Sequence, residues 1–324
     1  MKRILILGGG GMIGQKFAAK LAKNGLDGQP VEMILHDIGF PSGGVEASER
    51  ISGNLTDPGA TERLAAYRPD VIIHLAAVVS GEAEADFEKG WQVNMFATWS
   101  LLEALRSEHV ASAGAYVPRL VFASSIAVFG APFPEAIEDD FLSAPLTSYG
   151  AQKATCDLMV GDFSRKGFVD GLSIRLPTIC VRPGKPNKAA SGFFSGIIRE
   201  PLNGQEAVLP VPETVRHWHA SPRSAVGFLS HAATLDTGLL DGRRALNMPG
   251  VSCTVAEQIE ALREVAGPEV VSRIRTEPDP AIIDIVQGWP RNFEATRAMA
   301  LGFTADKDFR SIIDAYIADE RPGG

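Results

Sequence analysis

The chain has 324 residues, of which 45% are hydrophobic and 22% are charged, as in folded globular proteins and unlike disordered ones. Its formal net charge of −8 argues against binding to nucleic acid or to an anionic membrane surface, both of which need a basic face. Three scattered cysteines predict neither a disulfide scaffold nor a metal site, and they favour a reducing cytoplasm. No apolar run approaches the roughly 20 residues of a membrane-spanning helix.

The first half of the chain alternates short, apolar, β-rich runs with helical patterns. Strands of a parallel sheet are buried on both faces and therefore read as continuous apolar runs. This order predicts an α/β protein whose parallel sheet is doubly wound, of the Rossmann type, with helices on both faces. The expected strands are 4–7, 31–35, 71–75, 120–123 and 172–176, and the expected helices are 15–23, 60–67, 92–107 and 149–165.

The regular alternation of apolar runs and helical patterns ends after Pro177, and six prolines follow between residues 183 and 222. They predict no long regular element before about Ser224. Helical patterns return at 225–234, 254–265 and 309–319. We expect a first domain over 1–177 with about 223–250, and a smaller, irregular cap over about 178–222 and 251–324. The cap would cover the carboxyl ends of the strands, where open α/β sheets bind ligands.

A glycine-rich turn follows the first strand and opens the first helix. Gly8, Gly11 and Gly14 have the spacing G-x-x-G-x-x-G. Without Cβ atoms the chain can turn tightly and its backbone can approach a pyrophosphate, which the helix N-terminus also attracts. A tight turn with no ligand is the alternative. The motif predicts a dinucleotide site that includes Met12 and Ile13.

Asp37 strengthens this prediction, because it ends the second strand about 20 residues after the glycines, where a carboxylate can bind an adenosine ribose. A 2′-phosphate would meet like charge there, so NAD is favoured over NADP. A strand-end turn aspartate is the alternative. His74 is expected to be a packed core imidazole rather than a catalyst. Further residues expected beside NAD are Asn54 and Leu55 at the adenine, and Leu75, Ala76 and Ala77 after the fourth strand.

Tyr149 and Lys153 lie four residues apart, on one face of a helix. A tyrosine has a pKa of about 10, which a neighbouring ammonium lowers. Tyr149 can then take a proton from an alcohol as hydride leaves the same carbon. Ser125, just past a strand, would hold the substrate oxygen. The alternative is an incidental surface pair.

Taken together, these motifs resemble the extended short-chain dehydrogenases/reductases of the NAD-dependent epimerase/dehydratase group. The resemblance implies that Tyr149 is the acid/base, that Lys153 holds the nicotinamide ribose, and that Ser125 rather than Ser124 completes the triad. It also implies that Asn94 lies near the cofactor and braces the fold, that the backbone of Pro177 and Ile179 faces the nicotinamide, and that two helices per subunit, 92–107 and 149–165, form a homodimer interface. Phe129 departs from the usual tyrosine of the group.

The second half departs from the sugar-nucleotide epimerases of that family. Thr178 replaces the usual asparagine, and the stretch 216–223 lacks the usual carboxylates. Four runs instead resemble the D-erythronate dehydrogenase branch, namely 76–87, 175–187, 191–202 and 277–281. That resemblance implies NAD-dependent oxidation of the C2 hydroxyl of a small sugar acid. The alternatives are a nucleotide-sugar epimerase or dehydratase that retains NAD, and a non-catalytic dinucleotide sensor.

A sugar acid needs a cation for its carboxylate, ideally the fork of an arginine. Arg182 and Arg216 both fall where the cap is expected to meet the sheet, although either can equally be a structural ion-pair partner. Ser80 and Thr178 are candidates for the substrate hydroxyls. Trp218 is a candidate for the pocket wall, with burial in the cap as the alternative.

Overall fold

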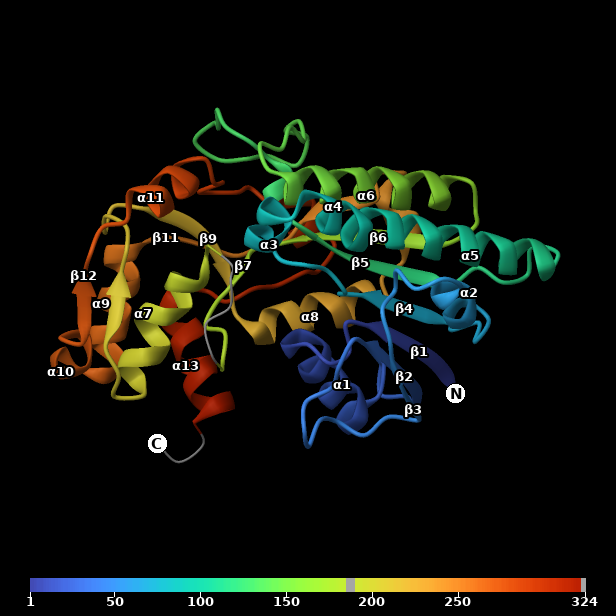
Figure 1. Cartoon of the computed structure of the whole chain (residues 1–324), viewed down its shortest axis with the longest axis horizontal. Coiled ribbons are helices and arrows are strands. Elements are labelled where there is room, and N and C mark those ends of the chain that lie inside the picture. Colours follow the sequence, from blue (N-terminus) through green and yellow to red (C-terminus); the bar gives the residue numbers. More distant parts are fainter. Residues whose placement is uncertain (185–189, 322–324) are drawn as a thin grey trace.

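A computed structural model of the chain describes residues 1–184 and 190–321, so that the positions from Lys185 to Asn187 of the run 175–187 lie outside the described residues. Its centre is a seven-stranded sheet in the order β10-β6-β5-β4-β1-β2-β3, and neighbouring strands pair in parallel (Figure 1). The strand order reverses between β1 and β4, which is the switch point of a doubly wound sheet. The predicted fold class is therefore confirmed. The strands are β1 (Lys2–Leu7), β2 (Val31–Asp37), β3 (Glu49–Ser52), β4 (Val71–His74), β5 (Arg119–Ser125), β6 (Asp170–Leu176) and β10 (Ala245–Asn247).

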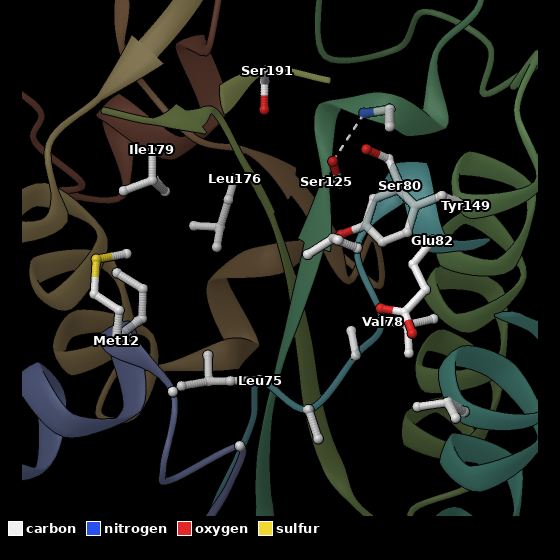
Figure 2. A pocket seen from close by; sticks show the side chains of 18 of the residues that line it. Met12, Leu75, Val78, Ser80, Glu82, Ser125, Tyr149, Leu176, Ile179 and Ser191 are labelled. Carbon is white, nitrogen blue, oxygen red and sulfur yellow. Dashed lines mark hydrogen bonds between the residues drawn. The ribbon is translucent and has the colours of Figure 1, made fainter. Parts of the chain in front are cut away.

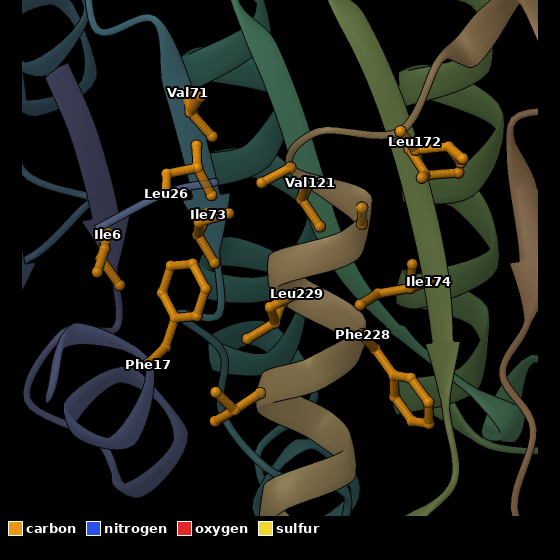
Figure 3. Close-up of a cluster of buried hydrophobic side chains, with 14 of the residues drawn as sticks. Ile6, Phe17, Leu26, Val71, Ile73, Val121, Leu172, Ile174, Phe228 and Leu229 are labelled. Carbon is orange, nitrogen blue, oxygen red and sulfur yellow. The ribbon is translucent and has the colours of Figure 1, made fainter. Parts of the chain in front are cut away.

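Both faces of this sheet are covered by helices, and β1 shows how. Ile6 packs in one cluster with Phe17 of α1 and Leu229 of α8 (Figure 3), whereas Leu5 and Leu7 pack on the other face with α2, α5 and α6. Successive side chains of a strand point to opposite faces, so burial on both sides requires the continuous apolar runs seen in the sequence. The helices are α1 (Met12–Asn24) and α8 (Pro222–Ala232) on one face, and α2 (Ala60–Ala65), α5 (Ala97–Ala111) and α6 (Ser148–Arg165) on the other.

The cap has a hydrophobic core of its own, which is built around a three-stranded sheet in the order β11-β9-β7. A two-stranded sheet of β8 and β12 and five helices complete it. These elements are β7 (Thr178–Ile179), β8 (Ala207–Leu209), β9 (Arg216–Ala220), β11 (Val251–Thr254), β12 (Ile274–Thr276), α7 (Gly192–Leu202), α9 (Val255–Ala266), α10 (Pro268–Val271), α11 (Pro280–Gln287) and α13 (Phe309–Glu320).

The expectation of no long regular element between Pro177 and Ser224 is wrong, because α7 spans 11 residues there. Two of these prolines lie near helix ends. Pro201 falls in the last turn of α7, and Pro222 occupies the first turn of α8, where its missing N–H costs no intrahelical hydrogen bond. The apolar face of α7, with Phe194, Ile197 and Ile198 fully buried, is held by the cap core.

One C-terminal segment leaves the cap and returns to the central sheet. Ala298 of α12 (Thr296–Ala300) and the following Phe303 are buried in the cluster beside α8. Residues 251–324 are therefore not all packed within the cap. The remaining short elements are α3 (Ser80–Ala85), α4 (Phe87–Gly90), η1 (Trp91–Phe96), η2 (Ile126–Val128) and η3 (Thr237–Leu240). Over residues 1–184 and 190–321, no helix has both the length and the apolar character to cross a membrane.

Candidate active site

A cavity of about 830 Å³ lies at the carboxyl ends of the strands, and both the central sheet and the cap line it (Figure 2). One end of the cavity is formed by the glycine turn after β1, and the other by Thr178, Arg182 and His217 from the cap. This is the position at which doubly wound sheets bind ligands. The volume is within the ~300–1,000 Å³ of small-molecule and cofactor sites.

The glycine turn is tight, and Gly8 and Gly14 have no room for a Cβ atom. A turn of this kind lets the backbone approach a dinucleotide. Gly8 has φ +86°, and a Cβ atom there would lie 2.8 Å from the backbone nitrogen of Ala76. A Cβ on Gly14 would overlap the carbonyl oxygen of Gly8. Gly11 caps α1 without a side-chain hydrogen bond, so the N–H groups of the first helical turn are left for an anion. Gly11, Met12 and Ile13 all line the cavity, as predicted for a pyrophosphate site.

Asp37 lies at the edge of this turn, at the end of β2. Its Oδ2 accepts a hydrogen bond of 2.9 Å from the Gly10 backbone N–H. Asn54 and Leu55, which follow β3, line the same end of the cavity. A carboxylate in this place can accept ribose hydroxyls and repels a 2′-phosphate, so the residues present fit NAD.

Leu75, Ala76 and Ala77 line the cavity after β4, and Pro177 and Ile179 line it after β6, as predicted. In Figure 2 the side chains of Met12, Leu75, Leu176 and Ile179 surround one end of the open space. This end of the cavity is therefore mostly apolar.

Asn94 does not line the cavity and lies behind its wall. Its Oδ1 accepts a hydrogen bond from the Val78 N–H at 2.9 Å, and its Nδ2 donates to Gln152 Oε1 at 2.7 Å. Asn94 thereby ties the loop after β4 to α6. The bracing contact agrees with the prediction, whereas the side chain is fully buried in η1 and does not reach the cavity.

Ser125 and Tyr149 both line the cavity, whereas Lys153 is buried behind them and is not among the lining residues. Ser125 ends β5, and its Oγ accepts a hydrogen bond from the Ala127 N–H at 3.1 Å. Tyr149 lies in the first turn of α6, which is capped by Thr147, and its hydroxyl points into the cavity beside Ser125 (Figure 2). Lys153 is buried one turn later, and its Nζ donates to the Ala123 carbonyl oxygen at 2.8 Å.

The charges around Tyr149 differ from the expectation. Burial raises the pKa of Tyr149 to about 12, against the lowering effects of the Ser125 hydroxyl and the Arg182 guanidinium. Burial also lowers the pKa of Lys153 to about 8. The Lys153 ammonium is directed at a backbone carbonyl, 5.7 Å from the centre of the Tyr149 ring. Among the neighbouring cations, it is Arg182 whose charge lowers the pKa of Tyr149.

Arg182 is partly buried in the cavity wall. Its Nη2 donates to Ser191 Oγ at 2.7 Å, and its own carbonyl oxygen accepts a hydrogen bond of 2.6 Å from Arg199. Within the described ranges, no carboxylate lies within 4.0 Å of its side-chain nitrogens. Burial removes water from the Arg182 guanidinium and thereby lowers its pKa. The same loss of water means that an anionic partner would stabilise the cation.

Arg216, the second arginine predicted for the substrate, lies outside this cavity. It forms an ion pair with Glu257 at 3.2 Å and donates to the Ser252 carbonyl oxygen at 3.1 Å. The structure does not bring Arg216 to the cavity with Tyr149, because Arg216 begins β9 and pairs in register with Thr254, beside helix α9. The structural alternative holds for Trp218 as well, since its indole is buried and donates to the Met248 carbonyl oxygen.

Several functional positions were not found by sequence reasoning. Ser80 and Thr178 line the cavity as predicted, but so do Glu82, Ser191, His217, Trp289 and Pro290. Trp289 and Pro290 lie far along the chain from the other lining residues and carry no local motif. His74, in contrast, is a core imidazole as predicted: it is fully buried, its Nε2 lies 3.1 Å from Thr98 Oγ1, and burial lowers its pKa to about 3.

Comparison with known proteins now identifies the family. Residues 4–220 match the family described as "NAD dependent epimerase/dehydratase family". The D-erythronate dehydrogenase of Cupriavidus necator is 45% identical over 98% of each chain, and that of Haemophilus influenzae is 41% identical over 97% of this chain and 98% of its own.

A solved structure of the nucleoside-diphosphate-sugar epimerase from Agrobacterium tumefaciens has a TM-score of 0.95 and 55% identity, and the match covers 100% of this chain and 95% of that one. The family match spans the glycine turn, the Ser125, Tyr149 and Lys153 positions and the first strands of the cap. The chain therefore belongs to the NAD-dependent epimerase/dehydratase family of extended short-chain dehydrogenases/reductases, and it is an NAD-dependent enzyme.

Proposed function

We propose that the enzyme oxidises the C2 hydroxyl of a small sugar acid of the D-erythronate type to the 2-oxo acid, with NAD as the oxidant. The observation that carries this proposal is the Arg182 guanidinium, which is partly buried in the same cavity wall as Tyr149 and Ser125. Among the described residues no carboxylate pairs with this partly buried cation, so an anionic ligand would stabilise it, and the planar fork of arginine suits a carboxylate. The names of the two D-erythronate dehydrogenases support the same substrate class.

The residues that would hold the cofactor extend along one side of the cavity. The glycine turn would bind the pyrophosphate, Asp37 the adenosine ribose, and Lys153 the nicotinamide ribose. When bound, NAD accepts the C2 hydrogen with its electron pair and adds the positive charge of its oxidised ring to the site.

The chain's own residues would position the alcohol and manage its proton. Arg182 would pair with the carboxylate and Ser80 would bind a hydroxyl, which would leave the C2 hydroxyl between Ser125 and Tyr149. Tyr149 would accept the C2 hydroxyl proton at its phenolic oxygen as the general base. The Ser125 hydroxyl and the Arg182 guanidinium both lower the pKa of Tyr149, but burial outweighs them and leaves it at about 12.

The test is to mix the purified enzyme with NAD and D-erythronate and to follow the absorbance of NADH. We expect NADH formation and a 2-oxo acid product. No NADH, together with conversion of a UDP-sugar without net oxidation, would overturn this proposal. That outcome would instead support the second candidate, a nucleotide-sugar epimerase, which the description of the 55% identical Agrobacterium structure favours.

We also propose that the enzyme is a homodimer that pairs η1, α5 and α6 of two subunits. Large apolar side chains are exposed on these helices, among them Phe96 at 46%, Trp99 at 44% and Leu158 at 76%. Such area on adjacent helices suits a four-helix interface. Sedimentation that shows only a monomer at micromolar concentration would exclude this assembly.

A further inference from the structure

His217 is a buried histidine of the cap whose two ring nitrogens both have defined partners. Its Nδ1 lies 2.9 Å from the Pro290 carbonyl oxygen, and its Nε2 lies 2.7 Å from Thr178 Oγ1. The side chain is 2% exposed, yet both His217 and Thr178 line the cavity. The pair therefore forms part of the wall that a substrate meets.

The partners determine where the protons lie. A carbonyl oxygen can only accept a hydrogen bond, so Nδ1 must carry a proton and donate to Pro290. In the neutral imidazole Nε2 is then unprotonated and can only accept, so the Thr178 hydroxyl must donate its proton to His217. Burial lowers the pKa of His217 to about 4, so the ring is neutral at neutral pH and this arrangement persists.

Packing holds the His217 ring in this orientation. It stacks on Phe194 with the two planes 2° apart and their centres separated by 5.1 Å. Trp289 covers it at 5.3 Å, and His219 lies edge-on at 5.3 Å. Rotation of the imidazole would break both hydrogen bonds inside a closely packed aromatic cluster, which makes the Pro290–His217–Thr178 chain a fixed element of the wall.

We propose that His217 is a positioning residue that turns Thr178 into an obligate hydrogen-bond acceptor toward the cavity. The only proton of the Thr178 hydroxyl is directed at His217, so its oxygen presents lone pairs alone to a ligand. This subsite would bind a hydroxyl of the substrate other than the one that is oxidised, and it would repel a carboxylate oxygen. The carboxylate would then be directed to Arg182. The inference rests on the proposed sugar-acid substrate. It assigns a hydroxyl of that substrate to Thr178 and its carboxylate to Arg182.

The kinetic test compares Thr178→Val with Thr178→Ser, which keeps the hydroxyl. We expect Thr178→Val to raise KM for D-erythronate about tenfold with a much smaller change in kcat, because one hydrogen bond in the bound state is lost. Thr178→Ser should stay within about threefold of the unaltered enzyme. Equal KM values for the two variants in an active enzyme would overturn this inference alone, whereas the absence of any NADH formation by the unaltered enzyme would remove the proposed function.

Substrate analogues test the role of His217 itself. Two analogues replace a non-reacting hydroxyl, one with hydrogen and one with fluorine, which accepts hydrogen bonds but cannot donate them. The unaltered enzyme should bind the fluorinated acid less well than the deoxy acid, because fluorine would face the Thr178 lone pairs. In His217→Phe, which keeps the aromatic packing, the Thr178 hydroxyl can turn, and the order of the two analogues should reverse. An unchanged order in a folded His217→Phe enzyme would contradict the proposal.

A third measurement does not depend on any substrate. In protein labelled with ¹⁵N-histidine, long-range proton–nitrogen spectra at neutral pH distinguish the two neutral tautomers and the imidazolium. The signals that disappear in His217→Phe identify the residue, and we expect them to show the Nδ1–H tautomer. An Nε2–H tautomer or an imidazolium at His217 would overturn the inference whatever the enzyme oxidises.

Discussion

The two ends of the cavity are built in different ways. The cofactor end is largely backbone, because Gly8 and Gly14 are glycines for want of space and α1 contributes its N-terminus. The cap end is made of side chains whose orientation depends on distant partners, as Arg182 does on Ser191 and His217 on Pro290. The cofactor end therefore suits a ligand that a large family shares. The cap end can bind a different ligand when a few of its side chains are exchanged.

Tyr149 lies where the two ends meet, and its replacement should give the largest effect. Tyr149→Phe removes the oxygen that accepts the substrate proton, so kcat should fall by about 10²- to 10⁴-fold. NAD affinity and the free energy of unfolding should change little, because the ring is kept. Steady-state kinetics and NAD titration measure the two quantities. Tyr67→Phe, outside the cavity, is the matched control and should retain full activity. Normal turnover by the Tyr149→Phe enzyme would exclude this tyrosine as the general base.

Arg182 and Arg216 provide a direct comparison within the cap. Arg182→Gln removes a partly buried charge that faces the cavity, and KM for the sugar acid should rise about 30-fold or more, equivalent to about 2 kcal/mol. Arg216→Gln removes only a partly exposed ion pair with Glu257 and should leave KM within about twofold. Kinetics with D-erythronate at saturating NAD measure both values. If Arg216→Gln had the larger effect, the assignment of the carboxylate site would have to be reversed.

These two arginines show how far the sequence alone can be interpreted. The central sheet and the positions of the glycine turn, Asp37 and Tyr149 at the cavity could be predicted, because each depends on neighbours within one strand–turn–helix unit. The roles of the arginines could not, since they depend on the register of β9 with β11 and on contacts with α7 and α9. Trp289 and Pro290 reach the cavity only through the folding of the whole cap. Helix α7 could not be predicted either, because its apolar face is stabilised by burial in the cap core, which a local sequence pattern does not show.

Gly14 tests whether the cofactor end depends on backbone fit. In Gly14→Ala the new Cβ would overlap the Gly8 carbonyl oxygen, and backbone cannot move aside as a flexible side chain can. We expect a loss of about 1–3 kcal/mol in stability, with weaker NAD binding, measured by urea unfolding and NAD titration. Gly161→Ala in α6 is the control, because nothing lies within 4 Å of a Cβ there, and it should stabilise the protein by about 0.5–1 kcal/mol. An equal response of the two variants would contradict the steric argument.

The cap and the central sheet each contain two buried histidines, but at His36 in the central sheet the charges of Asp37 and Asp57 oppose the effect of burial on the pKa, so acid should affect the cap more. Burial lowers the pKa of His217 to about 4, that of His219 well below its usual value, and that of His74 in the central sheet to about 3. Between pH 6.5 and about 4 the unfolded chain binds protons at these positions and the folded chain does not. The free energy of unfolding must therefore fall as the pH falls through this range, by up to about 1.4 kcal/mol per pH unit for each histidine.

Urea unfolding at pH 7.5 and 5.5 measures how steeply the free energy of unfolding changes with pH. His217→Phe should reduce this slope by the contribution of one histidine. Hydrogen exchange locates the effect, and amides of β9 and α7 should lose protection at pH 5.5 before those of β1 and β4. This range lies above the usual pKa of carboxyl groups, so the slope there reports mainly on histidines. Equal loss of protection in both sheets would mean that the cap and the central sheet unfold as one unit. The two ends of the cavity would then differ in the ligand groups they bind but not in their stability toward acid.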